Sequence, residues 1–239
     1  MFEHRVHNGV LQVSRPRTRW LSTGWNGGPS EGEVAYNVSV PEGWERTELS
    51  AYVETRREQA GFSRPGPTLL TGVDLKHARS ARYDSVEVIA TAGVSNPAAL
   101  PMNPSGERSV PAETRVGTVN LIVGTSRSPF EGALANMLTI AAEAKAATLF
   151  ERTGVPGTTT DAVIVACDPS GERVEFTGSA TPVGAAVRAC VREAVSASLD
   201  SRYAETTLAT AEEAKYGLET TERAEVFELS DRTDKVESD

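Results

Sequence analysis

The stretch of sequence that decides the fold lies between Val116 and Cys167. It opens with VGTVNLIV (Val116–Val123), continues with PFEGALANMLTIAAEAKAATLFER (Pro129–Arg152) and closes with DAVIVAC (Asp161–Cys167). The outer segments are short, apolar and β-branched, which is typical of buried strands. The middle segment repeats apolar residues at helical spacing, with Pro129 suited to a first helical turn and Gly154 to a left-handed cap. The stretch therefore predicts a strand, a long helix and a second strand.

The same alternation of strands and helices extends in both directions along the chain. Further strands are predicted at Gly9–Val13, Glu33–Val40, Thr68–Gly72, Val86–Ala92 and Glu172–Thr177. Further helices are predicted at Glu45–Ala60, Asp74–Arg82 and Pro182–Ser201. No internal repeat or linker interrupts residues 1–202. We therefore predict that these residues form a single layered α/β (or α+β) domain with a mixed β-sheet and packed helices.

The charge of this 239-residue chain is unevenly distributed. Its formal net charge is −9, yet residues 203–239 contain eleven acids and four bases, which leaves 22 acids and 20 bases in residues 1–202. The last 37 residues therefore resemble a flexible acidic tail, with a transient helix around Ala209–Gly217. Only four of the 24 bases are lysine. Few lysines and an excess of acid suggest a high-salt or GC-rich source.

Composition also excludes several classes of protein. A net negative charge argues against a general electrostatic grip on nucleic acid or on anionic lipid. No apolar run approaches the roughly 20 residues of a membrane-spanning helix, and the N-terminus lacks the apolar core of a secretory signal. Cys167 and Cys190 lie in apolar stretches and are expected to be buried thiols in a reducing compartment. We therefore expect a cytoplasmic protein.

The inventory of motifs argues against the commonest cofactor and metal sites. The sequence contains no G-x-G-x-x-G after a strand, no P-loop and no G-x-S-x-G elbow. Its three histidines form no H-E-x-x-H, and there is no C-x-x-C. We therefore expect neither a metal nor a cofactor.

Four short segments have the composition of a site, with polar side chains at strand ends or on a helix. They are Thr91–Asn96, Gly117–Asn120, Glu143–Lys145 and Gly157–Asp161. Taken singly, each is as well explained by turn chemistry or by a solvated helix face. Taken together, their order and spacing are more specific.

Together these segments resemble the adenosylcobinamide amidohydrolase family, which is found in archaea and some bacteria that salvage corrinoids. The family's Thr-Ala-Gly-x-x-Asn, Gly-Thr-(Ile/Val)-Asn, Glu-Ala-Lys and Gly-Thr-x-Thr-Asp segments match the four segments above. Arg19–Trp25, Gly27–Gly28 and Asn37 are similar to the family's opening strands. The resemblance covers about residues 9–202. One departure is Thr159, where the family often has a glycine; a positive φ there would strain a threonine.

The resemblance implies hydrolysis of the secondary amide that joins the corrin's propionyl side chain to aminopropanol. Such a reaction needs an activated nucleophile, donors for the oxyanion and an acid for the leaving amine. Our hypothesis for the catalytic groups is that Asp161 or Glu143 is the general base on water. Asn96, Asn120 or backbone N–H groups would then hold the oxyanion.

The remaining candidates are assigned to substrate binding. They are Thr91, Gly93, Gly117, Thr118, Thr158, Thr160, Lys145 and Trp25. The hydroxyls of Thr91, Thr118 and Thr160 stay open as covalent nucleophiles.

Lys145 lies about 160° from Glu143 on the helix, so the two side chains cannot both point into one pocket. Glu143 shares its face with Asn136 and is therefore favoured as the helix's site residue. Lys145 is equally well explained as a donor or as a snorkelling side chain. Trp25 would stack on the corrin or adenine face, although a tryptophan of this kind more often completes a core or an interface.

Two other functions fit the same residues. One is a non-catalytic corrinoid-binding or regulatory module, and the other is an amidohydrolase that acts on a different corrinoid amide. The expected partner is a corrinoid in every case, and the sequence is compatible with a homo-oligomer.

Overall fold

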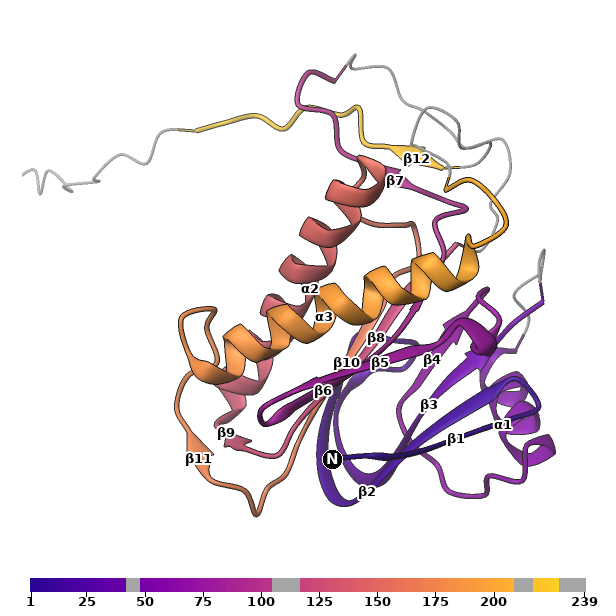
Figure 1. Cartoon of the computed structure of the whole chain (residues 1–239), viewed down its shortest axis with the longest axis vertical. Helices are drawn as coiled ribbons and strands as arrows, with labels where there is room; N and C mark the ends of the chain where they lie inside the picture. The colour runs from indigo at the N-terminus through magenta and orange to yellow at the C-terminus, as the bar shows by residue number, and fades with distance from the viewer. Residues whose placement is uncertain (42–47, 105–116, 209–216, 228–239) are drawn as a thin grey trace, which may run out of the picture.

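A computed structural model describes residues 1–41, 48–104, 117–208 and 217–227 of the chain. Its centre is a mixed eight-stranded sheet, with helices packed outside it (Figure 1). Seven strands follow the order β4 (Thr68–Thr71), β3 (Gly28–Ser39), β2 (Val10–Ser22), β10 (Ala162–Cys167), β8 (Val119–Thr125), β6 (Val86–Ala92) and β5 (Arg79–Tyr83). The eighth strand, β1 (Glu3–His7), pairs with β2. The prediction of an α/β domain with a mixed sheet is confirmed.

The strand–helix–strand unit predicted between Val116 and Cys167 is confirmed for its described part. Strands β8 and β10 are parallel neighbours, in register from Asn120 opposite Ala162 to Thr125 opposite Cys167. Helix α2 (Glu131–Thr153) connects them and ends at Gly154, whose φ of 77° is the left-handed cap that the sequence predicts. Pro129 is not in the first helical turn, because it belongs to the short strand β9 (Ser128–Pro129), which pairs with β11 (Arg173–Val174).

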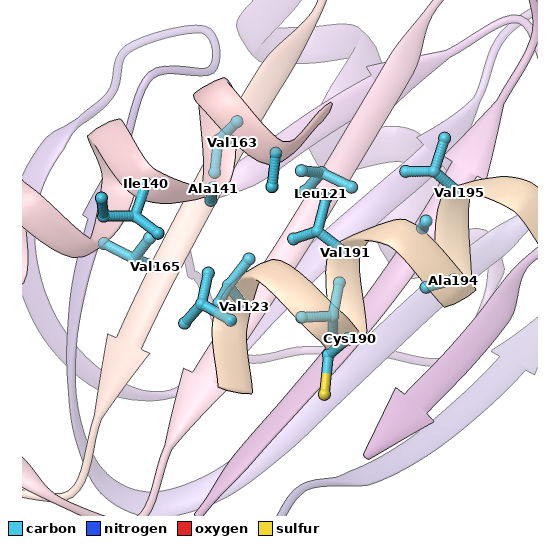
Figure 2. Packing of buried hydrophobic residues seen from close by; sticks show 14 of the residues in the cluster. Leu121, Val123, Ile140, Ala141, Val163, Val165, Cys190, Val191, Ala194 and Val195 are labelled. Carbon is cyan, nitrogen blue, oxygen red and sulfur yellow. The ribbon is translucent and has the colours of Figure 1, made fainter. Parts of the chain in front are cut away.

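Helices α2 and α3 (Pro182–Arg202) cover one face of strands β10, β8 and β6. Figure 2 shows this layer, where Leu121, Val123, Val163 and Val165 of the strands meet Ala141, Cys190, Val191, Ala194 and Val195 of the helices. The residues that alternate with these along each strand point to the other face of the sheet. Fully burying a side chain of this size stabilises the fold by roughly 1.5–3 kcal/mol. Packing of α2 and α3 against these strands therefore holds in place the strand ends that border the site.

The opposite face of the same strands is also buried, because the sheet curls. Leu69 of β4 and Ile89 of β6 come from strands far apart in the sheet, yet they belong to one buried cluster with Trp20 and Ile164. Helix α1 (Leu49–Gln59) lies beyond β3, where Tyr52 packs against a third cluster. Side chains at the curl are therefore enclosed by both halves of the sheet.

The prediction of a helix at Asp74–Arg82 is wrong. The Asp74 side chain caps a single 3-10 turn at Leu75–His77, and the chain then continues as β5. Residues Arg79 to Tyr83 pair antiparallel with β6, from Ala90 back to Val86. Pairing with a buried strand outweighs the local helical preference.

Other boundaries differ from the sequence-based expectation. Strand β2 continues to Ser22 through an irregular register between Ser14 and Thr18. The helix expected from Glu45 begins at Leu49, and residues 42–47 lie outside the described part.

The described part of the acidic segment contacts the domain. Leu218–Glu219 (β12) pairs with Ala98–Ala99 (β7), and Thr221 is buried. The transient helix expected at Ala209–Gly217 lies outside the described residues, apart from Gly217 itself.

Candidate active site

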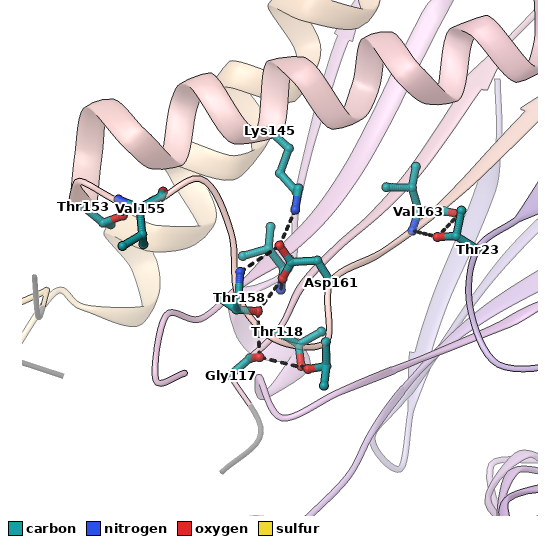
Figure 3. Close-up of polar contacts among 11 residues, drawn as sticks. Thr23, Gly117, Thr118, Lys145, Thr153, Val155, Thr158, Asp161 and Val163 are labelled. Atoms are coloured by element: carbon teal, nitrogen blue, oxygen red, sulfur yellow. Dashed lines mark hydrogen bonds and ion pairs between the residues drawn. The ribbon is translucent and has the colours of Figure 1, made fainter. Parts of the chain in front are cut away.

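Three of the four motif segments meet at one edge of the sheet. Strand β6 ends where β8 and β10 begin, so the register places Thr91 opposite Asn120 and Asn120 opposite Ala162. The loops beyond these ends bond to one another: Thr159 N donates to Asn96 O at 3.2 Å, and Ala98 N donates to Gly157 O at 2.9 Å. The fourth segment reaches the same edge from α2 through Lys145 (Figure 3). We call this edge the motif edge.

Asp161 and Lys145 form a buried ion pair at the motif edge, and each side chain is 11% exposed. Lys145 Nζ donates to Asp161 Oδ2, which also accepts the N–H of Thr158 at 3.0 Å. Asp161 Oδ1 accepts the N–H of Val119 at 2.8 Å and lies beside the hydroxyl of Thr158. The two carboxylate oxygens therefore accept three N–H groups, and the single hydrogen of the Thr158 hydroxyl is directed either to Asp161 Oδ1 or to Gly117 O.

Two motif glycines are explained by close approach. A Cβ on Gly157 would lie 2.8 Å from Asp161 Oδ2 and 3.3 Å from Lys145 Nζ. A Cβ on Gly117 would lie 2.5 Å from the backbone N of Asn96. Any side chain at either position would therefore push the motif segments apart.

Thr159 is not strained. Among the described residues it is absent from those with positive φ, and its side chain is exposed. The departure from the family pattern therefore leaves this turn intact.

The threonines of the motif edge bind each other and the backbone. The hydroxyls of Thr158 and Thr160 lie within hydrogen-bond distance of Gly117 O, at 2.8 and 3.0 Å. The hydroxyls of Thr118 and Thr160 are 3.0 Å apart. Thr118 is fully buried, whereas Thr160 is partly exposed. Of these three hydroxyls, that of Thr160 is the most accessible to a ligand.

Thr91 and Asn120 lie inside the curl of the sheet rather than on its surface. Asn120 Nδ2 donates to Leu70 O at 2.8 Å and to Asn37 Oδ1 at 3.1 Å, and Asn37 Nδ2 donates to Thr91 Oγ1 at 3.0 Å. Thr91 and Asn120 are at most 1% exposed. These motif residues therefore join β3, β4, β6 and β8 behind the motif edge.

Two buried amide oxygens lack a hydrogen-bond partner within the part of the chain that the structure describes. They are Oδ1 of Asn96 and Oδ1 of Asn120. A buried polar atom of this kind usually binds an ordered water or a ligand. Asn96 lies in the loop beside Gly117, so its free oxygen is at the motif edge itself.

Helix α3 supplies residues of the site that the sequence does not reveal. Ala92 N donates to Ser198 Oγ and Val94 N donates to Tyr203 Oη, both at 2.9 Å. A Cβ on Gly93, between these two anchors, would lie 2.8 Å from Val73 Cγ2. The sequence of α3 does not predict this role, because serine and tyrosine are common residues at the end of a helix.

Glu143 and Lys145 point away from each other, as the helical projection predicts. The structure places Lys145, and not Glu143, beside Asp161. Glu143 is exposed and approaches Arg188 of α3 at 3.6 Å. Its face is therefore the solvent side of the helix pair.

Trp25 belongs to neither the core nor a described interface. It is 39% exposed and lines a hollow of about 540 Å³ at the tip of the β2–β3 hairpin. Thr23, two residues earlier, accepts the N–H of Val163 with its hydroxyl at 2.9 Å. Thr23, near the hairpin tip, therefore lies beside Val163 at the start of β10, and Val163 is two residues from Asp161 in the chain (Figure 3). Trp20 is buried against Phe2, and Trp44 lies outside the described residues.

The described residues also bear on metal, thiol and membrane-spanning sites. No three His, Cys, Asp or Glu side chains in the described ranges gather as metal ligands. Cys167 and Cys190 are buried and unpaired, and burial raises the pKa of both thiols. Within the ranges that the structure describes, every helix is too short or too polar to cross a membrane.

Comparison with known proteins agrees with the motifs. The sequence profile of adenosylcobinamide amidohydrolase matches residues 2–207. The chain belongs to the adenosylcobinamide amidohydrolase family. An adenosylcobinamide amidohydrolase of Halobacterium salinarum is 53% identical over 231 residues, which cover 95% of this chain and 99% of that protein. A family member of that name from Methanosarcina mazei is 29% identical over 192 residues, covering 76% of this chain and 90% of that protein.

The Halobacterium relative agrees with the high-salt source that the composition suggests. Among solved structures, the PH0078 protein from Pyrococcus horikoshii matches with a TM-score of 0.39 and 10% identity over 90% of this chain and 83% of that one. At that score the likeness establishes neither fold nor function for this family member.

Proposed function

We propose that this protein hydrolyses the aminopropanol amide of adenosylcobinamide, giving adenosylcobyric acid and 1-amino-2-propanol for cobalamin synthesis. The observation that most supports this is the motif edge, where four segments distant in sequence enclose one buried Lys145–Asp161 pair. Membership of the family supplies the substrate class.

The two members of the ion pair have different roles in this proposal. The Asp161 carboxylate accepts three N–H groups and lies beside the Thr158 hydroxyl, so most of its acceptor positions are filled and it is a poor base for activating water. We assign it as a positioning residue that holds the Lys145 ammonium at the motif edge. Asp161 is the one acceptor that the described residues offer Lys145 Nζ, so two of its three N–H donors stay free. Those donors would bind the amide oxygen as it becomes an oxyanion.

Two further groups complete the proposed site. The free Oδ1 of Asn96 is suited to accept the N–H of the scissile amide. Trp25, at the neighbouring hairpin tip, would stack on the flat macrocycle. Glu143 has no role in this site, because it lies on the solvent side of α2.

Product analysis tests the proposal. Purified protein is incubated with adenosylcobinamide, and aminopropanol and adenosylcobyric acid are quantified by mass spectrometry. Lys145→Met should lower kcat at least about 100-fold, the usual effect of removing one oxyanion donor, with little change in KM; Lys145→Arg should restore part of it. Binding without any product from the wild type would instead indicate a non-catalytic corrinoid-binding module. Product from a nucleotide-loop corrinoid alone would indicate a different amide.

We also propose a cytoplasmic location. Two buried cysteines without a disulfide are typical of a reducing compartment.

A further inference from the structure

A second hollow lies at the end of the sheet opposite the motif edge. Strands β8 and β10 are parallel and begin at the motif edge, so their carboxyl ends lie together at the far end, near β9 and β11 (Figure 1). The hollow there has a volume of about 670 Å³ and is lined by residues of 128–131 and 169–173 and by Arg19 of β2. In open α/β sheets, ligands bind beyond the carboxyl ends of parallel strands. None of the residues assigned to the proposed reaction lines this hollow.

The far hollow is lined by an aromatic ring, two guanidinium groups and a carboxylate. The guanidinium of Arg173 lies over the ring of Phe130, 4.7 Å from its centroid, and Phe130 is 43% exposed. Arg19 donates to Pro129 O at the floor of the same hollow. Neither guanidinium forms an ion pair with a carboxylate of the described residues. Glu131, an exposed carboxylate, lines the opposite part.

The far hollow and the hollow at Trp25 each share lining residues with a third hollow. The third hollow, of about 370 Å³, shares Arg19 and Glu131 with the far hollow. It also shares Pro29, Ser30 and Glu31 with the hollow at Trp25. The three hollows therefore border one another along the β2–β3 hairpin and the start of α2.

We propose that the far hollow is a subsite for an adenine ring. Adenine has a π-face for the Arg173–Phe130 stack, ring-nitrogen acceptors for the guanidinium donors, and an exocyclic amino group for the carboxylate of Glu131. The adenosyl ligand of the corrinoid is one source of that ring, and a free adenine nucleoside is the other. The first source rests on the proposed function; the second does not.

The kinetic test compares adenosylcobinamide with cobinamide bearing cyanide in place of the adenosyl ligand. Arg173→Ala removes the stacking guanidinium and should raise KM for adenosylcobinamide about tenfold or more, the size of a lost base stack. The KM for the cyano form and the kcat for both should not change. Phe130→Leu should act in the same direction. Arg188→Ala, an exposed arginine on α3, is the matched control and should change neither KM.

A binding test covers the second source. Equilibrium dialysis with radiolabelled adenosine measures its dissociation constant for the wild type, Arg173→Ala and Arg188→Ala. If only adenosine binding weakens in Arg173→Ala, the subsite takes a free nucleoside, which still supports an adenine site. If Arg173→Ala changes neither the KM ratio nor adenosine binding, or affects both corrinoids equally, the adenine subsite is refuted.

The two proposals fail separately. If wild-type protein releases no aminopropanol from either corrinoid, the proposed function fails. The adenine subsite is then still tested by dialysis with adenosine and by the absorbance change on binding of adenosylcobinamide.

Discussion

Removing either member of the Lys145–Asp161 pair should destabilise the protein, and by unequal amounts. Each side chain is 11% exposed, so solvent screens the pair little. Asp161→Asn leaves a buried ammonium without a carboxylate, and such an uncompensated charge costs about 4 kcal/mol of unfolding free energy. Lys145→Met leaves a carboxylate that keeps the N–H groups of Thr158 and Val119 and the Thr158 hydroxyl. Its cost should be near that of one charged hydrogen bond, about 2 kcal/mol.

Urea unfolding followed by circular dichroism measures these losses, and the double variant completes a cycle that isolates the coupling energy of the pair. Arg188→Ala is the matched control, because its ion pair with Glu143 is about half exposed on both sides. That pair should contribute less than about 1 kcal/mol. Molar KCl should remove the surface contribution and leave most of the buried one.

The reasoning would be refuted by either of two results. One is a loss in Asp161→Asn no larger than in Arg188→Ala. The other is a larger loss in Lys145→Met than in Asp161→Asn. Either would mean that the ammonium is hydrated at the motif edge and does not depend on its carboxylate.

Three further predictions concern single side chains. Glu143→Gln should keep kcat within about twofold, because Glu143 faces solvent; a loss comparable to that of Lys145→Met would contradict the site. Trp25→Ala should raise KM for adenosylcobinamide roughly tenfold with kcat unchanged, as expected for a lost stacking surface, and an unchanged KM would remove Trp25 from the site. Burial, with the positive charges of Lys76 and Arg202 nearby, lowers the pKa of His77 below its ordinary 6.5. The unfolded state therefore binds more protons than the folded state, and the free energy of unfolding should fall as the pH drops below about 6.5. His77→Gln should flatten that dependence in thermal melts at pH 5–8, and an unaltered slope would assign it to other groups.

The layered fold follows largely from local patterns. The segments Val86–Ala92 and Asp161–Cys167 are rich in apolar and β-branched residues, and both form buried strands, the second from Ala162. The helix at Pro182 has a clear apolar stripe and a proline at its start, and it is observed from Pro182 to Arg202. The sequence does not predict strand β5, because its polar residues give no strand signal. Its conformation depends on pairing with β6 and on packing against α3.

The composition of the candidate site could also be read from the sequence, but the role of each residue could not. Thr91 and Asn120 lie in motifs that read equally well as ligands or as structure, and only the curl of the sheet shows that they are enclosed. The sequence predicts Asp161 or Glu143 as the general base. Two N–H donors of Asp161, Lys145 Nζ and Val119 N, come from distant parts of the chain, and no local pattern reveals that they fill its lone pairs.

The sequence by itself therefore determined the family, the α/β class and the set of residues to examine, because periodicity and short motifs are local properties of the chain. The tertiary structure decided that Lys145 rather than Glu143 reaches the motif edge, and that the Asp161 carboxylate is held by three N–H donors. It also decided that the hollows at Trp25 and at Arg173 both border a third hollow. Each of these findings depends on which atoms lie within about 3 Å of one another. Only the packing of the sheet and its helices brings segments that are far apart in the chain to that distance.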